Sequence, residues 1–421
     1  MNIVQRAARF VQSLRQPDDA RRCRHCGSTR TKKHGFYTRR VCLLRGVRRV
    51  RVPRYRCHSC GQTYSLPDRR WASRARYGRE VQRKGLDLYF HLGASWRQVA
   101  EWLRGEIRPG AGRSRQWCPC RRAVGGDRPG ARLSHVTVWR WAMRAGERAA
   151  AGWAEGGWAG VAHFSGGVVA DATAICIRGV WQRVHLIADG VSRVGMSLER
   201  WREEGEAYVA GRFRLWLGQW GIAWQEVKVL VSDGAQVYAG VLARVLRQAR
   251  QQRCLFHLWR NLLPDLKTYE AEAGQEAGRW VRFLLRLLWA IPTLAEAWVG
   301  LEDIERTLGE IPALAEVLRT VRRTLPELWG IVEAGLAVGE RTSNVAERFF
   351  RRLKQRTRRM GCFMSEGGAD HFLAAWLVYA NCEPYQVRKE RKRVYRHPGQ
   401  SPLEVGGAEM LGYSWLDLLE V

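Results

Sequence analysis

Two aspartates stand where the sequence could support metal-dependent chemistry. Asp171 lies in the middle of the β-branched, apolar run 167–173, and Asp233 ends the similar run 227–234. An aspartate inside a buried strand costs on the order of a few kcal/mol unless it is paired or bound to a metal. Each aspartate has its own apolar strand, so the two together predict a cation site on an α/β sheet.

A third acid, Glu347, opens a helix that is predicted to begin near Ser343. The face expected to pack on the core carries Val345, Phe349 and Leu353. The face shared with Glu347 is basic and carries Arg351, Lys354 and Arg358. A lone glutamate in a basic helix can be a surface ion pair. As a third ligand, Glu347 would complete a site for two Mg²⁺ (or Mn²⁺) ions about 3.5–4 Å apart, which activate a water or 3′-OH and stabilise the leaving oxygen.

Two CxxC pairs near the N-terminus predict a different kind of metal site. Each pair is followed by glycine, which is typical of a zinc knuckle, and the segments 33–39 and 47–56 between the pairs read as a β-ribbon. Four thiolates leave no open coordination position, so one structural Zn²⁺ would fold the module without doing chemistry. His25 and His58 are read as bystanders. The predicted ligands are Cys23, Cys26, Cys57 and Cys60.

The charge of the chain predicts a polyanionic partner. Lysine and arginine number 71 against 40 acidic residues, a formal net charge of +31. Arginine supplies most of this charge, and its planar fork suits phosphate. A GC-rich genome would explain the arginine preference but not the net charge. The arginines of the cysteine-paired segment are either a DNA grip or a solvated basic face: Arg39, Arg40, Arg45, Arg48, Arg49, Arg51, Arg54 and Arg56.

Three predicted helices between these sites resemble a helix-turn-helix. They cover 79–91, 96–103 with a capping box at Ser95, and 134–143, with the Gly/Pro/Arg-rich stretch 105–132 before the last. The last helix places Val138, Trp141, Ala142 and Ala145 on a core face. Its opposite face, with Thr137, Arg140 and Arg144, is expected to read DNA. The alternative is a small structural three-helix bundle. Cys118 and Cys120 are too close together for a zinc knuckle, and their role is open.

The residues predict an α/β core, a zinc ribbon and a helix-turn-helix, with nearly all helix after residue 258, and the resemblance described below implies that this helical stretch is an insertion in the core. The expected domains are 1–70 (zinc ribbon), 71–155 (split helix-turn-helix), 160–257 (first part of the core), 258–336 (helical insertion), 337–383 (last part of the core, with the third acid) and 384–421 (tail). No run of 18 apolar residues and no signal-peptide core occur, which predicts a cytoplasmic, nucleoid-associated protein without a membrane partner. Asp189 is read as an ordinary Asp-Gly turn with no functional role.

Several motifs closely resemble the Mutator (MULE-type) transposases of bacterial insertion sequences. They are SDGA at 232–235, QRCxxH at 252–257, SNxxER at 343–348, LKxRxR at 353–358 and GCF at 361–363. The resemblance covers about residues 160–380. It implies an RNase H-like core of the DDE class, with Asp171, Asp233 and Glu347 as the catalytic acids. It also implies a helical insertion between the second and third acids.

Cys254 and His257 have the spacing of zinc ligands but no obvious partners. They are expected to pack beneath the active site, where His257 would hydrogen-bond Asp233 or a DNA phosphate. Their role is therefore read as support of the acids or of the fold.

The predicted function is a DNA transposase that binds terminal inverted repeats, cleaves DNA and transfers the strand. Its partners would be duplex transposon ends and target DNA, bound by a homodimer or higher oligomer. One alternative is a domesticated DNA-binding protein without catalysis, against which the three acids argue. Another is a structure-selective nuclease, against which the basic helix after Glu347 and the two N-terminal modules argue. Cut-and-paste and copy-out pathways remain open.

Overall fold

A computed structural model describes residues 22–23, 25–65, 75–107, 133–154, 163–336, 343–385, 399–410 and 412–421. The chain forms two compact units, each built from segments distant in sequence. The first comprises Met1–Trp153, Arg358–Tyr379 and Glu409–Val421; the second comprises Ala154–Thr357 and Ala380–Ala408. The expected segments 337–383 and 384–421 are thus each shared between both units. Cys118 and Cys120 lie outside the described residues.

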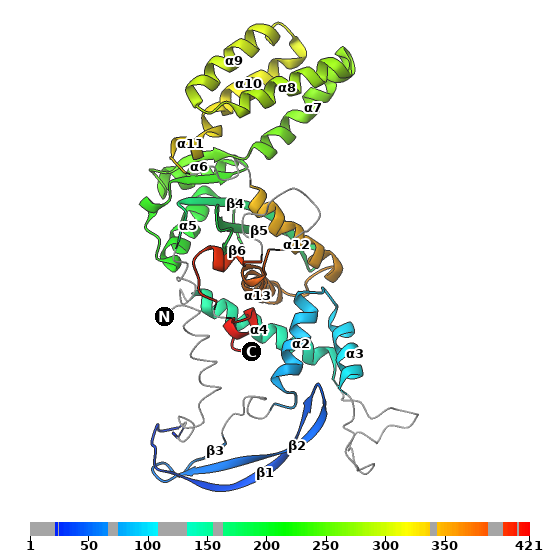
Figure 1. The fold of residues 1–421 in the computed structure, drawn as a ribbon, viewed down its shortest axis with the longest axis vertical. Helices are drawn as coiled ribbons and strands as arrows, with labels where there is room; N and C mark the ends of the chain where they lie inside the picture. The colour runs from blue at the N-terminus through cyan, green and yellow to red at the C-terminus, as the bar shows by residue number, and fades with distance from the viewer. Residues whose placement is uncertain are drawn as a thin grey trace. The chain divides into compact units, whose positions relative to one another are not determined.

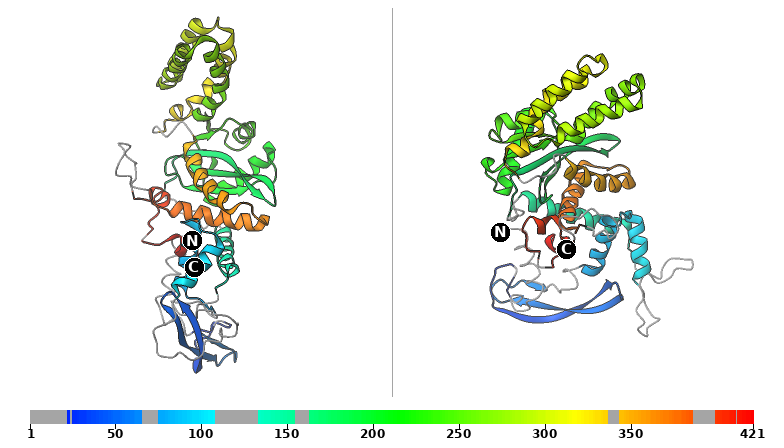
Figure 2. Two further views of the ribbon diagram at one scale, coloured as in Figure 1. Left: turned by 90° about the vertical axis from the view of Figure 1, so that its right-hand side faces the viewer. Right: turned by 45° about the horizontal axis from the view of Figure 1, so that its top comes forward.

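The first unit begins with a three-stranded antiparallel sheet in the order β1-β2-β3. Its long hairpin of β1 (Thr31–Leu43) and β2 (Gly46–Cys57) is drawn in blue in Figures 1 and 2, and β3 (Thr63–Ser65) pairs with the end of β2. A small apolar cluster packs at the far end of the hairpin, where Val41 and Leu43 are buried against Val50. The strands therefore run further than the expected 33–39 and 47–56.

Three helices follow in the same unit: α2 (Arg79–Phe90), α3 (Trp96–Glu106) and α4 (His135–Ala154). The capping box that opens α3 is present, with Ser95 and Gln98 bonded reciprocally. The expected core face of α4 is confirmed, because Val138, Trp141, Ala142 and Ala145 are at most 4% exposed. The helix runs eleven residues past the expected end at Met143, because residues such as Ala149 continue its buried stripe.

C-terminal residues complete this unit's core. Phe372 lies on α13 (Glu366–Cys382) and Trp415 on α15 (Trp415–Leu418), and both rings pack on Phe90 of α2. Gly146 of α4 lies so close to α13 that a Cβ there would be 2.3 Å from the backbone oxygen of His371. The tight helix crossing therefore requires glycine at this position.

The second unit contains a five-stranded mixed sheet in the order β6-β5-β4-β7-β8. The strands are β4 (Gly167–Ile177), β5 (Val180–Asp189), β6 (Gly195–Arg200), β7 (Val229–Ser232) and β8 (Arg250–Arg253). The first three form an antiparallel meander, and β7 and β8 continue it parallel to β4. Its buried strands are rich in Val, Ile and Leu, which confirms the predicted mixed α/β architecture.

Helix α5 (Glu206–Trp220) connects β6 to β7, and α6 (Gln236–Arg244) connects β7 to β8. They pack against each other through Phe213 and Tyr238, whose ring centroids are 6.5 Å apart. The sheet is also tied to the C-terminal part of the unit. Buried Asn381, near the end of α13, exchanges two backbone hydrogen bonds of 2.8 Å with Gly195 on β6.

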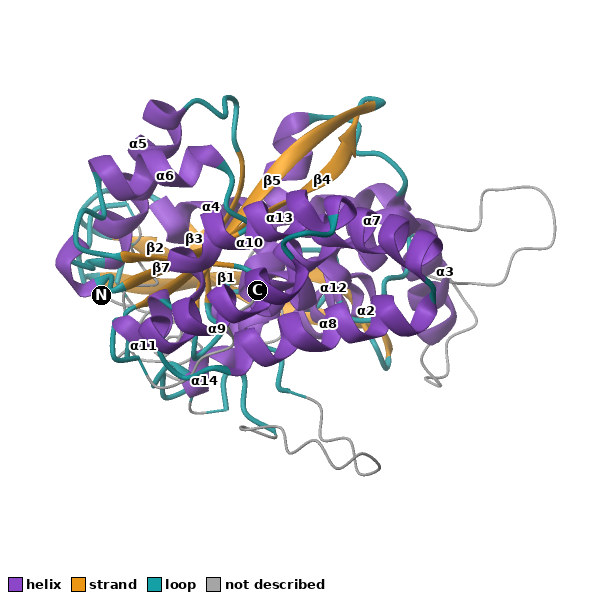
Figure 3. Ribbon diagram, turned by 90° about the horizontal axis from the view of Figure 1, so that it is seen from above, coloured by secondary structure: helices purple, strands orange, loops and turns teal. Residues whose placement is uncertain are grey.

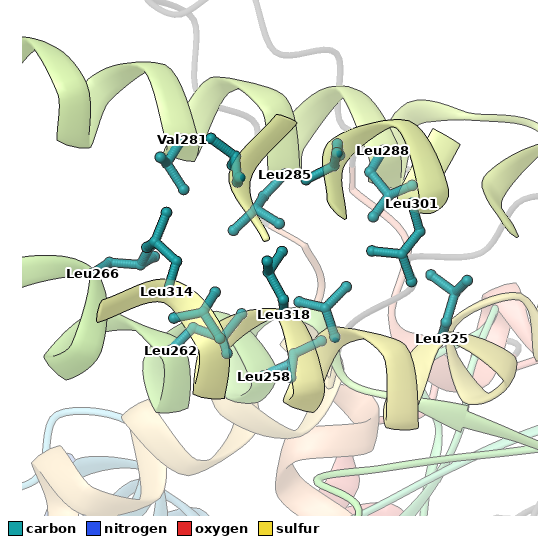
Figure 4. Close-up of a cluster of buried hydrophobic side chains, with 14 of the residues drawn as sticks. Leu258, Leu262, Leu266, Val281, Leu285, Leu288, Leu301, Leu314, Leu318 and Leu325 are labelled. Carbon is teal, nitrogen blue, oxygen red and sulfur yellow. The ribbon is translucent and has the colours of Figure 1, made fainter. Parts of the chain in front are cut away.

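A helical segment leaves the sheet after β8, as predicted for 258–336. Its helices are α7 (Leu255–Ala273), α8 (Gln275–Ala290), α9 (Leu294–Leu308), α10 (Ala315–Thr324) and α11 (Gly330–Glu333). Leucines from these helices interdigitate in a separate apolar core, which Figure 4 shows. The amphipathic spacing in each helix buries one stripe, so the insertion is stabilised by its own core.

The end of the insertion packs on the strand from which it departs. A Cβ on Gly330 would lie 2.2 Å from the backbone oxygen of Gln251 in β8. The fully buried side chain of Gln252 accepts a 3.2 Å hydrogen bond from the backbone N–H of Ile331. Both ends of the helical segment are therefore held at β8.

The core face of α12 (Asn344–Met360) differs from the prediction in one residue. Val345 and Leu353 are buried as expected, but Phe350 is buried at 4% exposure and Phe349 is only half-buried. The buried stripe follows Ala346, Phe350, Leu353 and Thr357, at the i, i+4, i+7 and i+11 spacing of a helix face. The prediction had the right helix with its core face turned by about one residue.

Across the described residues, no helix is both long and apolar enough to span a membrane.

Candidate active site

The two predicted aspartates occupy equivalent places on neighbouring parallel strands. Val169 of β4 is in register with Val231 of β7. Two residues further along each strand stand Asp171, within β4, and Asp233, directly after β7. Side chains at equal register positions of parallel strands point to the same face, and the strands lie about 4.8 Å apart. The fold therefore brings together two carboxylates that are distant in sequence.

Asp171 is the more buried of the two, with 7% exposure. Burial raises the pKa of its carboxyl, and the charge of Asp233 raises it further. The backbone N–H of Ala172, the charge of His257 and the hydroxyl of Ser343 act in the opposite direction. A divalent ion beside such a carboxylate would offset both its burial and the charge of the neighbouring acid.

Other polar groups line the same region. Burial raises the pKa of the Tyr238 hydroxyl on α6, and the charges of Asp233 and Asp171 raise it further, so this neutral phenol lies beside the acids. The hydroxyl of Thr173, two residues after Asp171 on the same strand face, is buried with no hydrogen-bond partner among the described groups. Such an atom is available to a bound water or ligand.

Glu347 lies in the first turn of α12 and is half-buried. The structure does not bring Glu347 to ligand distance of the aspartates. Among the described residues, only four cysteines converge closely enough to share a metal ion. A chain of hydrogen bonds instead links Glu347 to the end of β7, next to Asp233. Its backbone N–H donates to Ser343 (3.0 Å), and the N–H of Ser343 donates to Cys254 Sγ (3.2 Å). The N–H of Cys254 in turn donates to the oxygen of Ser232 (2.7 Å), next to Asp233.

Cys254 and His257 form the centre of this link. The Ser343 hydroxyl lies 3.2 Å from Cys254 Sγ and 3.4 Å from His257 Nδ1. The pKa of His257 is raised, first by its hydrogen bond to Cys254 and then by the charges of Cys254, Asp171 and Asp233, against the effect of burial. Burial raises the pKa of the Cys254 thiol, but hydrogen bonds from His257 and Ser343 outweigh it and lower the value. The charges of Asp171 and Asp233 reach His257, but the printed hydrogen bonds of the pair go to Ser343 and not to Asp233 as expected.

The turn after β7 explains part of the SDGA motif. Gly234 has φ of +86°, and a Cβ there would lie 2.7 Å from the guanidinium carbon of Arg253. Both conformation and space therefore require glycine. The Asp233 carboxylate accepts a 2.9 Å hydrogen bond from the N–H of Ala235, which orients it at the strand end.

Asp189 is a fully buried carboxylate with a structural role that its Asp-Gly context did not reveal. Its two oxygens accept hydrogen bonds from the backbone and hydroxyl of both Ser165 and Ser192, and from the N–H of Val191. This carboxylate ties the β5–β6 turn to the start of β4. Five donors satisfy it without a metal.

The four predicted cysteines converge in the first unit. Their sulfur atoms all lie within 4.8 Å of one another, with Cys23–Cys60 at 3.5 Å and Cys26–Cys57 at 3.6 Å. A tetrahedral zinc with bonds of about 2.3 Å requires sulfur separations of about 3.8 Å, so the donor set fits zinc. Desolvation opposes ionisation of Cys57, but backbone N–H groups of Cys60 and Ser59 and the neighbouring thiols lower its pKa to about 6.

The two knuckles are built alike. Gly27 and Gly61 have φ of +71° and +70°, and their N–H groups donate to the backbone oxygens of Cys23 and Cys57. A Cβ at either glycine would meet nothing within 4 Å, so conformation, not space, requires glycine.

The residues predicted to contact DNA are accessible. On α4, Arg140 and Arg144 are exposed and Thr137 is half-buried, with its N–H donating to the capping Ser134 hydroxyl (3.2 Å). On α12, Arg351, Lys354 and Arg358 are all exposed.

Sequence reasoning missed Ser343 and Tyr238 as neighbours of the acids. Ser343 was noted as a helix start and as the first residue of the SNxxER motif, but its complete burial was not expected. Its contact with Cys254 joins residues 89 positions apart, which no local pattern signals. Tyr238 lies in the first turn of α6 and belongs to no motif.

The second unit thus combines a mixed sheet, a register-matched aspartate pair and a helical segment between β8 and α12, and the first unit carries a four-cysteine cluster. These features define a class of α/β protein, and residues 163–383 match the model of one family, "Transposase, Mutator family". The match covers more than half of the 421 residues. The chain belongs to the Mutator family of transposases. A comparison with curated proteins finds no match.

Proposed function

We propose that the chain is a DDE transposase that binds terminal inverted repeats, cleaves DNA at them and joins the 3′-OH to target DNA. The observation that carries the proposal is the register match of Asp171 and Asp233 on β4 and β7, within the family-matched region. The meander β4–β5–β6 continued by parallel β7 and β8 supports an RNase H-like core.

Asp171, Asp233 and Glu347 would hold two Mg²⁺ or Mn²⁺ ions. The fit rests on hard oxygen donors, on the electrostatic strain of Asp171 and on the unpartnered Thr173 hydroxyl beside it. The ions would lower the pKa of the attacking water or 3′-OH and stabilise the leaving oxygen. The aspartates would set the ion position from rigid strands, while Glu347 approaches from the start of α12.

Cys254, His257 and Ser343 act in this proposal as positioning residues. They connect the turn after β7 with the first turn of α12, so they fix how Glu347 is presented to the aspartates. His257 also places a donor beside the acids, where a scissile phosphate would lie.

The N-terminal modules would supply end recognition. The four-cysteine ribbon with its exposed arginines would hold the DNA backbone, and α4 would present Thr137, Arg140 and Arg144 to the major groove. Arg351, Lys354 and Arg358 of α12 would follow the backbone near the reacting phosphate. Acting on two ends implies a homodimer or higher oligomer on DNA.

Substitution of the acids tests the proposal. Asp171→Ala, Asp233→Ala and Glu347→Gln should each reduce Mg²⁺-dependent cleavage of terminal-repeat DNA by at least about 1,000-fold, because each removes a ligand needed for charge stabilisation. DNA binding, measured separately with Ca²⁺, should change little.

Glu272→Gln is the matched control, since Glu272 is an exposed acid in the helical insertion. It should cleave like the unsubstituted protein. Retained cleavage in any of the three variants would remove that acid from the site. Binding without cleavage in the unsubstituted protein would favour a DNA-binding protein, and hydrolysis without joining would favour a nuclease.

A further inference from the structure

The hairpin of β4 and β5 extends beyond the rest of its sheet. β7 pairs with β4 only over Gly167–Val169, and β6 pairs with β5 over Val184–Ala188. Among the described strands, residues 174–183 therefore pair only with one another, and Figure 3 shows the two long arrows running side by side. Asp171 stands at the root of this two-stranded ribbon.

The tip of the ribbon exposes large apolar side chains. Arg178 and Gly179 form a two-residue turn with φ of +51° and +82°, which keeps the strands paired to their ends. Directly after it, Val180 is 60% and Trp181 72% exposed, whereas Ile175 and Ile177 on the partner strand are 1% exposed. The ribbon is thus packed along its length and open at its end.

The charge around the tip favours a polyanion. Residues 172–183 include two arginines and no acid. Arg178 is exposed, and the Arg183 side chain is 66% exposed although it pairs with Glu204 at 3.0 Å. An apolar point flanked by arginines is a known way to enter DNA, because the apolar group separates a base step while cations hold the flanking phosphates.

The reach of the ribbon sets where such an entry would occur. Trp181 pairs with Cys176, five residues along β4 from Asp171. At about 3.4 Å per residue this is about 17 Å. Stacked base pairs rise about 3.4 Å each, so a ribbon that lies along the duplex axis would place its tip about five base pairs from the reacting phosphate.

We propose that Val180 and Trp181 form an apolar wedge that inserts into duplex DNA about five base pairs from the phosphate held at Asp171, with Arg178 and Arg183 on the adjoining phosphates. The inference rests on the proposed function, because it uses Asp171 as the site of cleavage. Inserting the wedge bends the DNA at that step and fixes the distance from the bend to the cut.

The test uses full-length protein and short duplexes copied from the two flanks of the gene. The fluorescent base 2-aminopurine, which brightens when unstacked, is placed at successive positions, with Ca²⁺ present so that no cleavage occurs. The same duplex with Mg²⁺ gives the cut position. We expect one bright step about five base pairs from the cut. In Trp181→Ala it should disappear and binding should weaken about tenfold, while Trp181→Phe should retain both.

Trp280→Ala is the matched control, since Trp280 is a 54% exposed tryptophan on α8. It should leave the fluorescence profile unchanged. An unchanged profile in Trp181→Ala, with cleavage intact, would overturn the wedge alone. A change in oligomeric mass of DNA-free Trp181→Ala would instead identify the tip as a contact between copies. If the unsubstituted protein does not cut the flank DNA, the proposed function fails and the wedge falls with it.

Discussion

The cysteine cluster and the carboxylate site differ in how the chain assembles them. The four thiols come from one short region, and backbone turns at Gly27 and Gly61 aim them at a common centre. The acids come from β4, the end of β7 and the start of α12, and they depend on the register of a whole sheet. The four thiols already converge as a ligand set without metal, whereas the carboxylate site contains one buried aspartate, Asp171, whose pKa is raised.

This difference separates metal for folding from metal for chemistry. When zinc binds four cysteines that converge only in the folded module, the binding free energy stabilises the folded state of that module. Burial instead raises the pKa of Asp171, so its ionised carboxylate opposes folding, and a hard divalent ion would offset that cost. Loss of zinc should therefore unfold the sheet of β1, β2 and β3, whereas loss of the divalent ion should lower stability only slightly and leave the five-stranded sheet folded.

The largest expected effect is at the cluster. Cys57→Ser should release the zinc and unfold the sheet of β1, β2 and β3, because structural zinc sites carry about 10–16 kcal/mol of apparent binding free energy. Metal analysis should give about one zinc per chain in the unsubstituted protein and in Cys42→Ser, whose cysteine lies on β1 outside the cluster. Absence of zinc from protein purified without chelators would break the comparison.

Acid should act on the sheet through His185. Burial, and then Arg183, lower the pKa of His185 to about 4, and the nearby Glu204 is already paired with Arg183. His185 therefore takes up a proton near pH 6.5 in the unfolded chain but only near pH 4 in the folded chain. The free energy of unfolding should fall by up to about 3 kcal/mol as the pH drops from about 6.5 to 4. His185→Phe should flatten this loss and keep the ring stack on Trp201.

Denaturant unfolding at several pH values, followed by tryptophan fluorescence, measures the effect. His163→Phe, at an exposed histidine, should behave like the unsubstituted protein. Zinc release on acidification should be unchanged in His185→Phe, because thiolate protonation governs it. An equal acid loss with and without His185 would assign the acid sensitivity elsewhere.

The hydrogen-bond link to Glu347 should matter for rate. Ser343→Ala removes the hydroxyl that bonds Cys254 and His257, and loss of a ligand-supporting contact costs about 10–100-fold. We expect slower cleavage and a higher Mg²⁺ requirement with unchanged DNA binding. Ser365→Ala, which removes the hydroxyl bonded at the start of α13, should leave the Mg²⁺ requirement alone. If Ser343→Ala and Ser365→Ala both lower the melting temperature and neither changes the Mg²⁺ requirement, Ser343 has only a structural role.

Asp171→Asn should stabilise the metal-free protein. Burial raises the folded-state pKa of Asp171, so its contribution is favourable only below the unfolded value near 3.8 and is lost as the pH rises. At pH 7 the substitution should raise the melting temperature by a few degrees and abolish any stabilisation by Mg²⁺. A lower melting temperature in Asp171→Asn would contradict the strain assigned to this site.

The smallest effects concern DNA contact. Arg351→Ala should reduce the slope of log affinity against log salt by about one for any sequence, because one phosphate contact is lost. Arg140→Ala on α4 should instead weaken the preference for terminal-repeat DNA over scrambled DNA. Binding of both variants to both duplexes across a salt series separates the roles, and reversed outcomes would show that the two surfaces were misassigned.

Local patterns in the sequence predicted most of what the structure shows. The CxxC-Gly knuckles, the Ser95 capping box and the core face of α4 depend on residues within a few positions, and all three are confirmed. The apolar runs around Asp171 and Asp233 located both strands. Their register match could not be read from either strand, because it depends on pairing across the intervening β5, β6 and α5.

Long-range contacts explain the remaining misses. The turn at Asp189 is present, but its bonds to the start of β4 were missed, because they come from Ser165, 24 positions earlier. The core face of α12 was assigned from spacing alone, and Phe349 and Phe350 both satisfy it nearly equally. Ser343 meets Cys254 only because the insertion closes on itself between them.

Because the helical insertion begins and ends at the same strand, it forms a separate structural module. Its first helix leaves directly after β8, and its last returns to Gln251 and Gln252 of the same strand, with its own leucine core between. A segment whose two ends meet at one strand can lengthen, shrink or be exchanged during evolution at little cost to the sheet. Related elements could thus diversify what this segment contacts while Asp233 and Glu347 keep their places.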